Sequence, residues 1–179
     1  FLLILISFSC KKKEELAIDR TTLTASEAIE QLKNPLTTKP LDWSNQDLTF
    51  LDEVGNKSII GLGEATHGTK EFFEAKHRIF QYLVENHGFK IFAIEADLGE
   101  SILLNQAIQE GRTTDIRSLM EEKMLFSWVW KTEEVLALLE WMSEYNKGKM
   151  NADKLQYVGI DCQMNNYYSN FILTYLEQY

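Results

Sequence analysis

The stretch that decides the fold is SIIGLGEATHGTKEFFEAKHRIFQYLVENHGFKIFAIEA, residues 58–96. Residues 58–63 form a short, mostly apolar segment that contains two β-branched isoleucines and ends in glycine, which predicts a buried strand. Residues 70–87 carry apolar side chains at helical spacing, and Gly88 follows as the C-terminal cap. Residues 90–95 predict a second strand. A strand, a helix and a strand in succession indicate a parallel α/β unit.

Helices and one more strand are expected on the C-terminal side of this unit. The spacing of apolar residues predicts helices over 101–111, 114–122 and 132–146, the last beginning at Thr132 ahead of two acidic residues. LQYVGID, residues 155–161, predicts a third buried strand. Strands that alternate with helices form parallel sheets. The expected fold is therefore an α/β layered domain with a parallel β-sheet flanked by helices.

The N-terminal residues predict a signal and a tether rather than part of the core. Residues 1–9, FLLILISFS, match the length of a signal-peptide core and are too short to span a bilayer. With Cys10 they resemble a bacterial lipoprotein signal, so we expect export and a lipid on that cysteine; a plain secretory signal or a short membrane-associated end is the alternative. Charged residues 11–25 indicate a tether, and the domain is expected over 26–179. The helical pattern at Tyr179 has no end signal, so the domain is expected to be incomplete there.

Charge and cysteine content narrow the possible functions. The chain has 18 Lys and Arg against 27 Asp and Glu, a formal net charge of -9, which disfavours nucleic acid and favours a small-molecule ligand. Cys162 ends an apolar strand and is interpreted as a small buried hydrophobe without a disulfide or a nucleophilic role. No serine stands in a G-x-S-x-G elbow, so water is the preferred nucleophile.

Four ionisable groups are expected at one edge of the sheet. Glu64 and His67 follow the first predicted strand, Glu95 ends the second and Asp161 ends the third. The carboxyl ends of parallel strands meet at one edge, where ligands bind. A neutral imidazole can take a proton from water, and a neighbouring carboxylate can orient it. We predict that His67 is the base and that Glu64 or Glu95 orients it.

Lys76 lies where the helix should be apolar. At about 100° per residue it falls in the middle of the apolar face, and a buried, unpaired ammonium is costly. Its side chain is therefore expected to reach the carboxyl edge and pair with a carboxylate; a purely structural ion pair is the alternative. Glu64, His67 and Glu95 could also ligate a metal, but a loop does not fix a Glu-x-x-His pair as a helix would. No metal and no cofactor is the preferred expectation.

Several segments together carry a family resemblance. In order they are GEATHG at 63–68 with KEFF at 70–73, RIFQYLVENHGFKIFAIEA at 78–96, WVWKTEEVLALLEWMSEYN at 128–146 and VGID at 158–161. At these segments the sequence resembles the erythromycin esterase family. The resemblance implies a hydrolase that cleaves an ester or lactone of the macrolide type.

The resemblance also implies roles for single residues. Under it, His67 is the general base that activates water and Glu64 is its partner in the Glu-x-x-His turn. Glu95 matches an active-site glutamate, and Lys76 falls where family members carry an arginine, so the cation is kept without its bidentate geometry. Family members are longer, with a second active-site histidine in a region beyond Tyr179.

The predicted site and its alternatives can be stated together. The predicted catalytic residues are His67, Glu64, Glu95 and Lys76, and the predicted substrate-binding residues are Asp161 and Glu71. The expected partner is a small-molecule ester or lactone, and membrane contact is expected only through a lipid on Cys10. A metal-dependent hydrolase and a lipoprotein that binds a ligand without turnover are the two alternatives.

Overall fold

The computed structural model describes residues 36–37, 39–162, 173 and 177. The predicted signal and tether, Cys10 included, lie outside these residues, so export and lipidation stay predictions. None of the helices formed by the described residues is both long enough and apolar enough to cross a bilayer.

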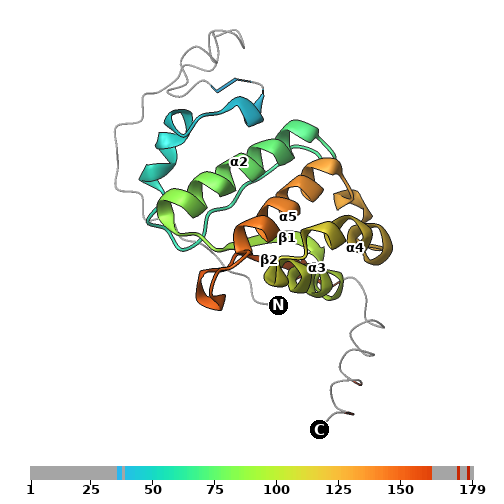
Figure 1. The fold of residues 1–179 in the computed structure, drawn as a ribbon. Helices are drawn as coiled ribbons and strands as arrows, with labels where there is room; N and C mark the ends of the chain where they lie inside the picture. The colour runs from blue at the N-terminus through green and yellow to red at the C-terminus, as the bar shows by residue number, and fades with distance from the viewer. Residues whose placement is uncertain (1–35, 38, 163–172, 174–176, 178–179) are drawn as a thin grey trace. The chain divides into compact units, whose positions relative to one another are not determined.

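The helices and strands that the sequence predicts between residues 70 and 161 are all present (Figure 1). They are α2 (Lys70–His87), β1 (Ile91–Asp97), α3 (Leu98–Glu110), α4 (Ile116–Lys123), α5 (Glu133–Asn146) and β2 (Gln156–Asp161). Short 3-10 helices lie at Pro40–Asp42, Gln46–Glu53, Thr113–Asp115, Trp128–Trp130 and Asn151–Asp153.

Helix ends follow from capping residues. Gly88 takes a left-handed conformation with φ 71° and ends α2, and Thr132 accepts a hydrogen bond from the Val135 N–H at the start of α5. α3 begins earlier than predicted because the Asp97 side chain accepts the Glu100 N–H, at 3.1 Å. That cap turns the chain directly from β1 into α3.

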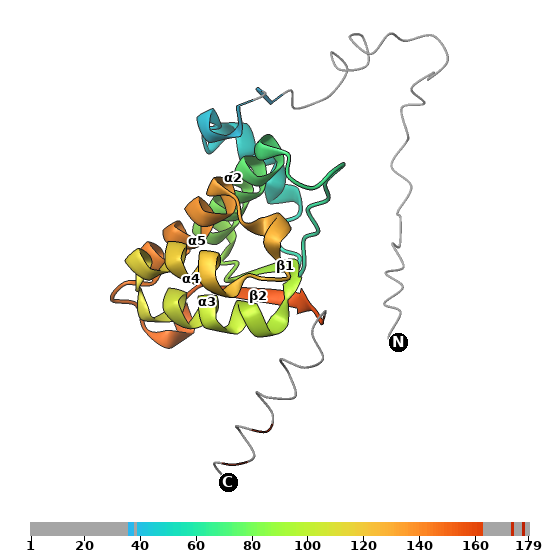
Figure 2. The same cartoon turned by 90° about the vertical axis from the view of Figure 1, so that its right-hand side faces the viewer.

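The two strands pair in parallel, and helices flank them. The register runs from Ile91 opposite Gln156 to Ile94 opposite Gly159, and then shifts so that Asp97 lies opposite Asp161. α2 and α5 lie on one side of the strands and α3 on the other, as Figures 1 and 2 both show. The predicted α/β class with a parallel sheet is therefore confirmed.

The core lies between the strands and the helices. Its members include buried residues of every labelled helix and of both strands, among them Phe80, Phe92, Leu104, Leu139 and Tyr157. A Cβ atom at Gly159 would lie 2.6 Å from the Ala96 carbonyl oxygen, so this position of β2 requires glycine. Glycine at this position lets the carboxyl ends of the two strands lie close together.

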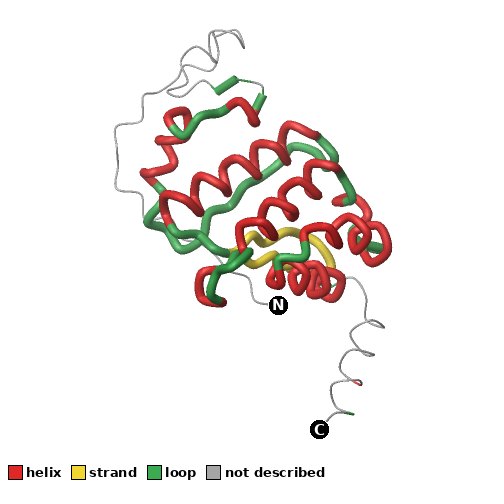
Figure 3. Tube along the Cα trace, in the orientation of Figure 1, coloured by secondary structure: helices red, strands yellow, loops and turns green. Residues whose placement is uncertain are grey.

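The predicted strand over residues 58–63 is wrong. Figure 3 draws this segment as a loop, and it makes no backbone hydrogen bond to another backbone group of the described chain. Its alternation is nevertheless that of an extended chain, with Ile60 and Leu62 partly buried and Ile59 83% exposed. The alternation correctly predicts which side chains face inward, but no strand of the described residues pairs with the backbone of this segment.

The interpretation of Cys162 as a buried residue is also wrong. The side chain is free and exposed. It lies just past the last residue of β2.

Candidate active site

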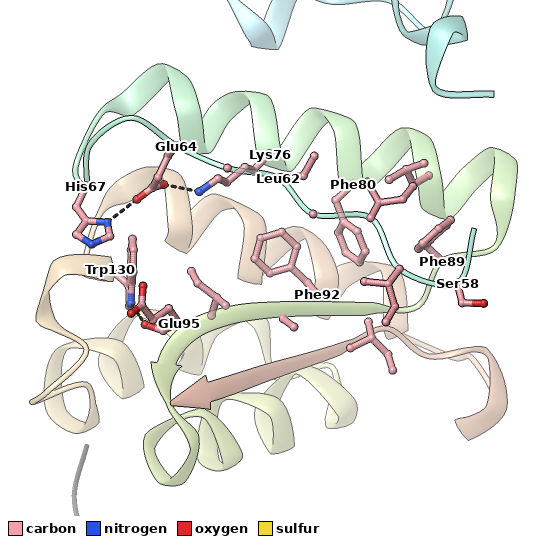
Figure 4. Close-up of a pocket in the computed structure, with 18 residues that line it drawn as sticks. Ser58, Leu62, Glu64, His67, Lys76, Phe80, Phe89, Phe92, Glu95 and Trp130 are labelled. Atoms are coloured by element: carbon pink, nitrogen blue, oxygen red, sulfur yellow. Dashed lines mark hydrogen bonds and ion pairs between the residues drawn. The ribbon is translucent and has the colours of Figure 1, made fainter. Parts of the chain in front are cut away.

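Glu64 joins His67 to Lys76 (Figure 4). One carboxylate oxygen, Oε1, lies 2.5 Å from His67 Nδ1, and the other, Oε2, accepts a hydrogen bond from Lys76 Nζ. The side chains of Glu64 and Lys76 are 12% and 14% exposed, whereas that of His67 is 57% exposed. The prediction that Lys76 leaves the apolar face to reach a carboxylate is confirmed, and the carboxylate is that of Glu64.

The charges of this group support an ionised Glu64. Partial burial raises the pKa of Glu64, but hydrogen bonds from Lys76 and His67 outweigh burial, and the pKa lies below its ordinary value. Because an ionised carboxylate only accepts hydrogen bonds, His67 carries its proton on Nδ1. No described residue hydrogen-bonds to His67 Nε2, so that nitrogen can accept a proton.

Glu95 lies at the point where the register of β1 shifts. Its carbonyl oxygen accepts a hydrogen bond of 2.6 Å from the Trp130 indole N–H. The ring of Trp130 then meets the ring of His67 edge-on, with centroids 4.9 Å apart and planes at 81°. Trp130 therefore lies between the end of β1 and the His67 imidazole and contacts both.

Sequence reasoning assigned no role to Trp130. It belongs to the WVWK segment that contributed to the family resemblance, but its indole binds a backbone carbonyl 35 residues away. The available signal was a tryptophan in the connection between two amphipathic helices, just before the cap of the second. That signal does not identify the group to which the indole hydrogen-bonds.

A cavity of about 540 Å³ connects these residues. Glu64, His67, Lys76, Glu95 and Trp130 all line it, and most of its remaining lining is apolar. Figure 4 shows the polar groups gathered at one end and the aromatic side chains Phe80, Phe89 and Phe92 toward the other. A mostly apolar cavity with a few polar groups at one end is typical of small-molecule sites.

Two predicted site residues lie apart from this cavity. Glu71 is exposed on the first turn of α2, and Asp161 ends β2, where its carboxylate accepts the Cys162 N–H at 2.7 Å. Neither lines the cavity. Their substrate-binding role stays a prediction, without a contact that supports it.

The acidic, histidine and cysteine side chains of the described residues do not form a metal-binding cluster. Within them, no group of three or more His, Cys, Asp or Glu side chains is placed to hold a metal ion. Glu64 and His67 contact each other, and Lys76 occupies the second oxygen of the carboxylate.

The family model for erythromycin esterase matches residues 84–179, more than half of the chain. The chain belongs to the erythromycin esterase family. The match includes Glu95 and Trp130 and begins after Glu64, His67 and Lys76. Within the site, the family match therefore covers Glu95 and Trp130, together with the helices and strands that support them.

Two curated relatives agree with this assignment. Erythromycin esterase type II of Escherichia coli is 30% identical over 112 residues, which are 63% of this chain and 25% of that protein. A Bacillus subtilis (strain 168) protein named "Putative hydrolase YbfO" is 34% identical over 129 residues, 70% of this chain and 27% of that protein. The chain spans about a quarter of the length of these relatives.

Solved structures share the fold of this family member. A succinoglycan biosynthesis protein matches with a TM-score of 0.65 and 34% identity, over 80% of this chain and 36% of that one. A Bacillus cereus protein matches with the same TM-score and identity, over 81% of this chain and 34% of that one.

Proposed function

We propose that this protein hydrolyses an ester or a lactone with water that His67 activates. The observation that carries the proposal is the short contact between Glu64 Oε1 and His67 Nδ1, with Lys76 on the other carboxylate oxygen. The contact holds the neutral ring in the tautomer whose Nε2 can remove a proton from water. Water would then attack the carbonyl carbon, and the products would be a carboxylic acid and an alcohol.

Glu64 and Lys76 prepare the imidazole for this step. When His67 takes a proton it becomes a cation, and the adjacent carboxylate stabilises that cation. Lys76 keeps Glu64 ionised and fixes its position, because Nζ holds the second oxygen. Lys76 thereby balances the charge of Glu64, and a developing oxyanion at the mouth of the cavity would lie near the same positive charge.

The cavity supports an apolar substrate. Ile60, Leu62 and Phe92 contribute to a lining that can bury the hydrocarbon part of an ester while the carbonyl lies at the polar end. The name of the Escherichia coli relative supports a macrolide as the favoured instance. Glu95 lines the same end and is the second carboxylate able to orient substrate or water.

The experiment uses the full-length protein expressed from its whole gene. It is incubated with a panel of simple esters, lactones and macrolides, and products are identified by mass spectrometry. Hydrolysis of a lactone gives a product heavier than its substrate by the mass of one water molecule. We expect His67→Ala to lower kcat/KM by about 100-fold or more, the usual contribution of a general base.

His87→Gln is the matched control for that substitution. His87 lies at the end of α2, where its Nε2 contacts Asp52 at 2.8 Å, and it does not line the cavity. The His87→Gln protein should hydrolyse substrate at the wild-type rate. A full-length His67→Ala protein with unchanged activity would refute the mechanism, and binding without any change of mass would favour the ligand-binding alternative.

A further inference from the structure

The loop between α4 and α5 is fixed by a buried carboxylate. Glu100, 4% exposed, accepts backbone N–H groups from Leu125 at 2.6 Å, Phe126 at 2.9 Å and Ser127 at 3.1 Å. A buried carboxylate is costly unless hydrogen bonds satisfy it, and these three do. The Ser127 hydroxyl in turn accepts the Asp97 N–H at 2.8 Å, which ties the loop to the end of β1.

Trp130 closes this loop and is itself fixed. Its side chain is 4% exposed, and its indole N–H donates to the Glu95 carbonyl at 2.6 Å. Phe73 packs against the ring, with centroids 5.4 Å apart. A buried indole with its one donor engaged cannot rotate without losing that hydrogen bond, so it presents a rigid edge.

His67 needs such a support. It belongs to a segment that no strand holds, and the only hydrogen bond that its ring makes to the described residues is the one between Nδ1 and Glu64. One hydrogen bond fixes a point on the ring but leaves the ring free to tilt about it. The edge-on contact with Trp130, at 4.9 Å between centroids, restricts that tilt.

We propose that Trp130, locked onto the carbonyl of Glu95, is the positioning residue that holds the His67 imidazole in its working orientation. The proposal rests on the proposed function, in which His67 is the base. Trp130 lines the cavity beside His67, and its proposed role is exercised through the ring that it supports.

The kinetic experiment compares two tryptophans in the full-length protein. Trp130→Phe keeps an aromatic ring but loses the indole N–H, while Trp141→Phe changes a partly buried indole of α5 that packs on His77 and does not line the cavity. We expect Trp130→Phe to lower kcat by about ten- to a hundredfold, with KM changed less than about twofold, because misplaced catalytic groups slow the chemical step. Trp141→Phe should leave kcat within about twofold of the wild type.

A spectroscopic experiment reads the contact without changing Trp130. Removing an imidazole from the edge of an indole changes the emission of that indole. In the Trp141→Phe background, which removes the His77 pair, adding His67→Ala should therefore change the emission, because it removes the ring that contacts Trp130.

The results separate this proposal from the proposed function. Wild-type kcat in Trp130→Phe, or emission that is unaffected by His67→Ala, would overturn the positioning role. If His67→Ala retained full hydrolytic activity while the emission change still depended on both residues, the contact would exist and the assignment of the base would be wrong. That outcome would also overturn the positioning role, because no base would remain to be positioned.

Discussion

Two regions of this molecule meet at the site, and they are held in different ways. The sheet unit, defined as β1, β2, α3 and α5, has a backbone ladder and side chains such as Leu139 that are 0% exposed. The site segment, residues 58–69, has no backbone hydrogen bond between residues 58–68 and another backbone group of the described chain, and Ile59 is 83% exposed. The first region supplies rigidity, and the second supplies His67, the proposed base.

The difference shows how the site is assembled. Glu64 and His67 belong to the site segment, whereas Lys76 comes from α2 and Trp130 from the loop before α5. The segment is positioned by the ion pair to Lys76 and the ring contact to Trp130 rather than by a strand ladder. The geometry of the candidate site therefore depends on a few side-chain contacts, whereas we expect stability to depend mainly on the sheet unit.

The largest expected effect on stability separates the two regions directly. Leu139→Ala removes a fully buried side chain and should lower the free energy of unfolding by about 2–5 kcal/mol. Ile59→Ala removes an exposed side chain and should change it by less than about 0.5 kcal/mol. Chemical denaturation of both variants measures the contrast, and equal losses would show that the site segment is as well packed as the sheet unit.

A second contrast concerns a buried histidine of α2. Burial, aided by the charge of Arg78, lowers the pKa of His77 from 6.5 to about 4. The unfolded chain therefore binds the proton more readily, so stability is full above pH 6.5 and is lost as the pH falls toward 4. At pH 4 protonation of His77 should have lowered the free energy of unfolding by about 3 kcal/mol.

His77→Phe keeps a ring against Trp141 and removes the titrating group. Its free energy of unfolding should therefore fall less steeply with acidification than that of the wild type, by about 3 kcal/mol between pH 7 and pH 4. Denaturation curves at a series of pH values provide the comparison. Parallel pH dependences for the two proteins would mean that His77 is not buried in its neutral form.

The smallest contrast uses one substitution in both regions. At Gly159 a Cβ atom would lie 2.7 Å from the Asp97 carbonyl oxygen, whereas at Gly63 it would meet nothing within 4 Å. Gly159→Ala should cost about 1–3 kcal/mol through overpacking. Gly63→Ala should change the free energy of unfolding by less than about 0.5 kcal/mol. A large loss at Gly63 would indicate that the site segment packs more tightly than the structure shows.

Much of the fold could be predicted because its signals are local. The limits of α2 follow from apolar spacing and Gly88, and the start of α5 follows from Thr132. The ion pair of Lys76 could be predicted for the same reason, since helical geometry alone places a lysine on a buried face that it must leave.

The remaining features depend on contacts between distant parts of the chain. Residues 58–63 have the composition of a strand, but a strand also needs a neighbour to pair with, and the sequence of one segment does not supply it. Glu100 reads as an ordinary acidic residue of a first helical turn, yet its carboxylate binds a loop 25 to 27 residues away. Trp130 was missed because its partner is a backbone carbonyl, which every residue has.

The central claim is that Glu64 and Lys76 act as one unit to hold His67, and a double-mutant cycle tests it most directly. The measurement is kcat/KM of the full-length protein for Glu64→Gln, Lys76→Met and the double variant. The account predicts that each single variant loses about 100-fold and that the double variant is less than about tenfold slower than either, because both changes break the same unit. Losses that multiply to about 10⁴-fold would contradict it.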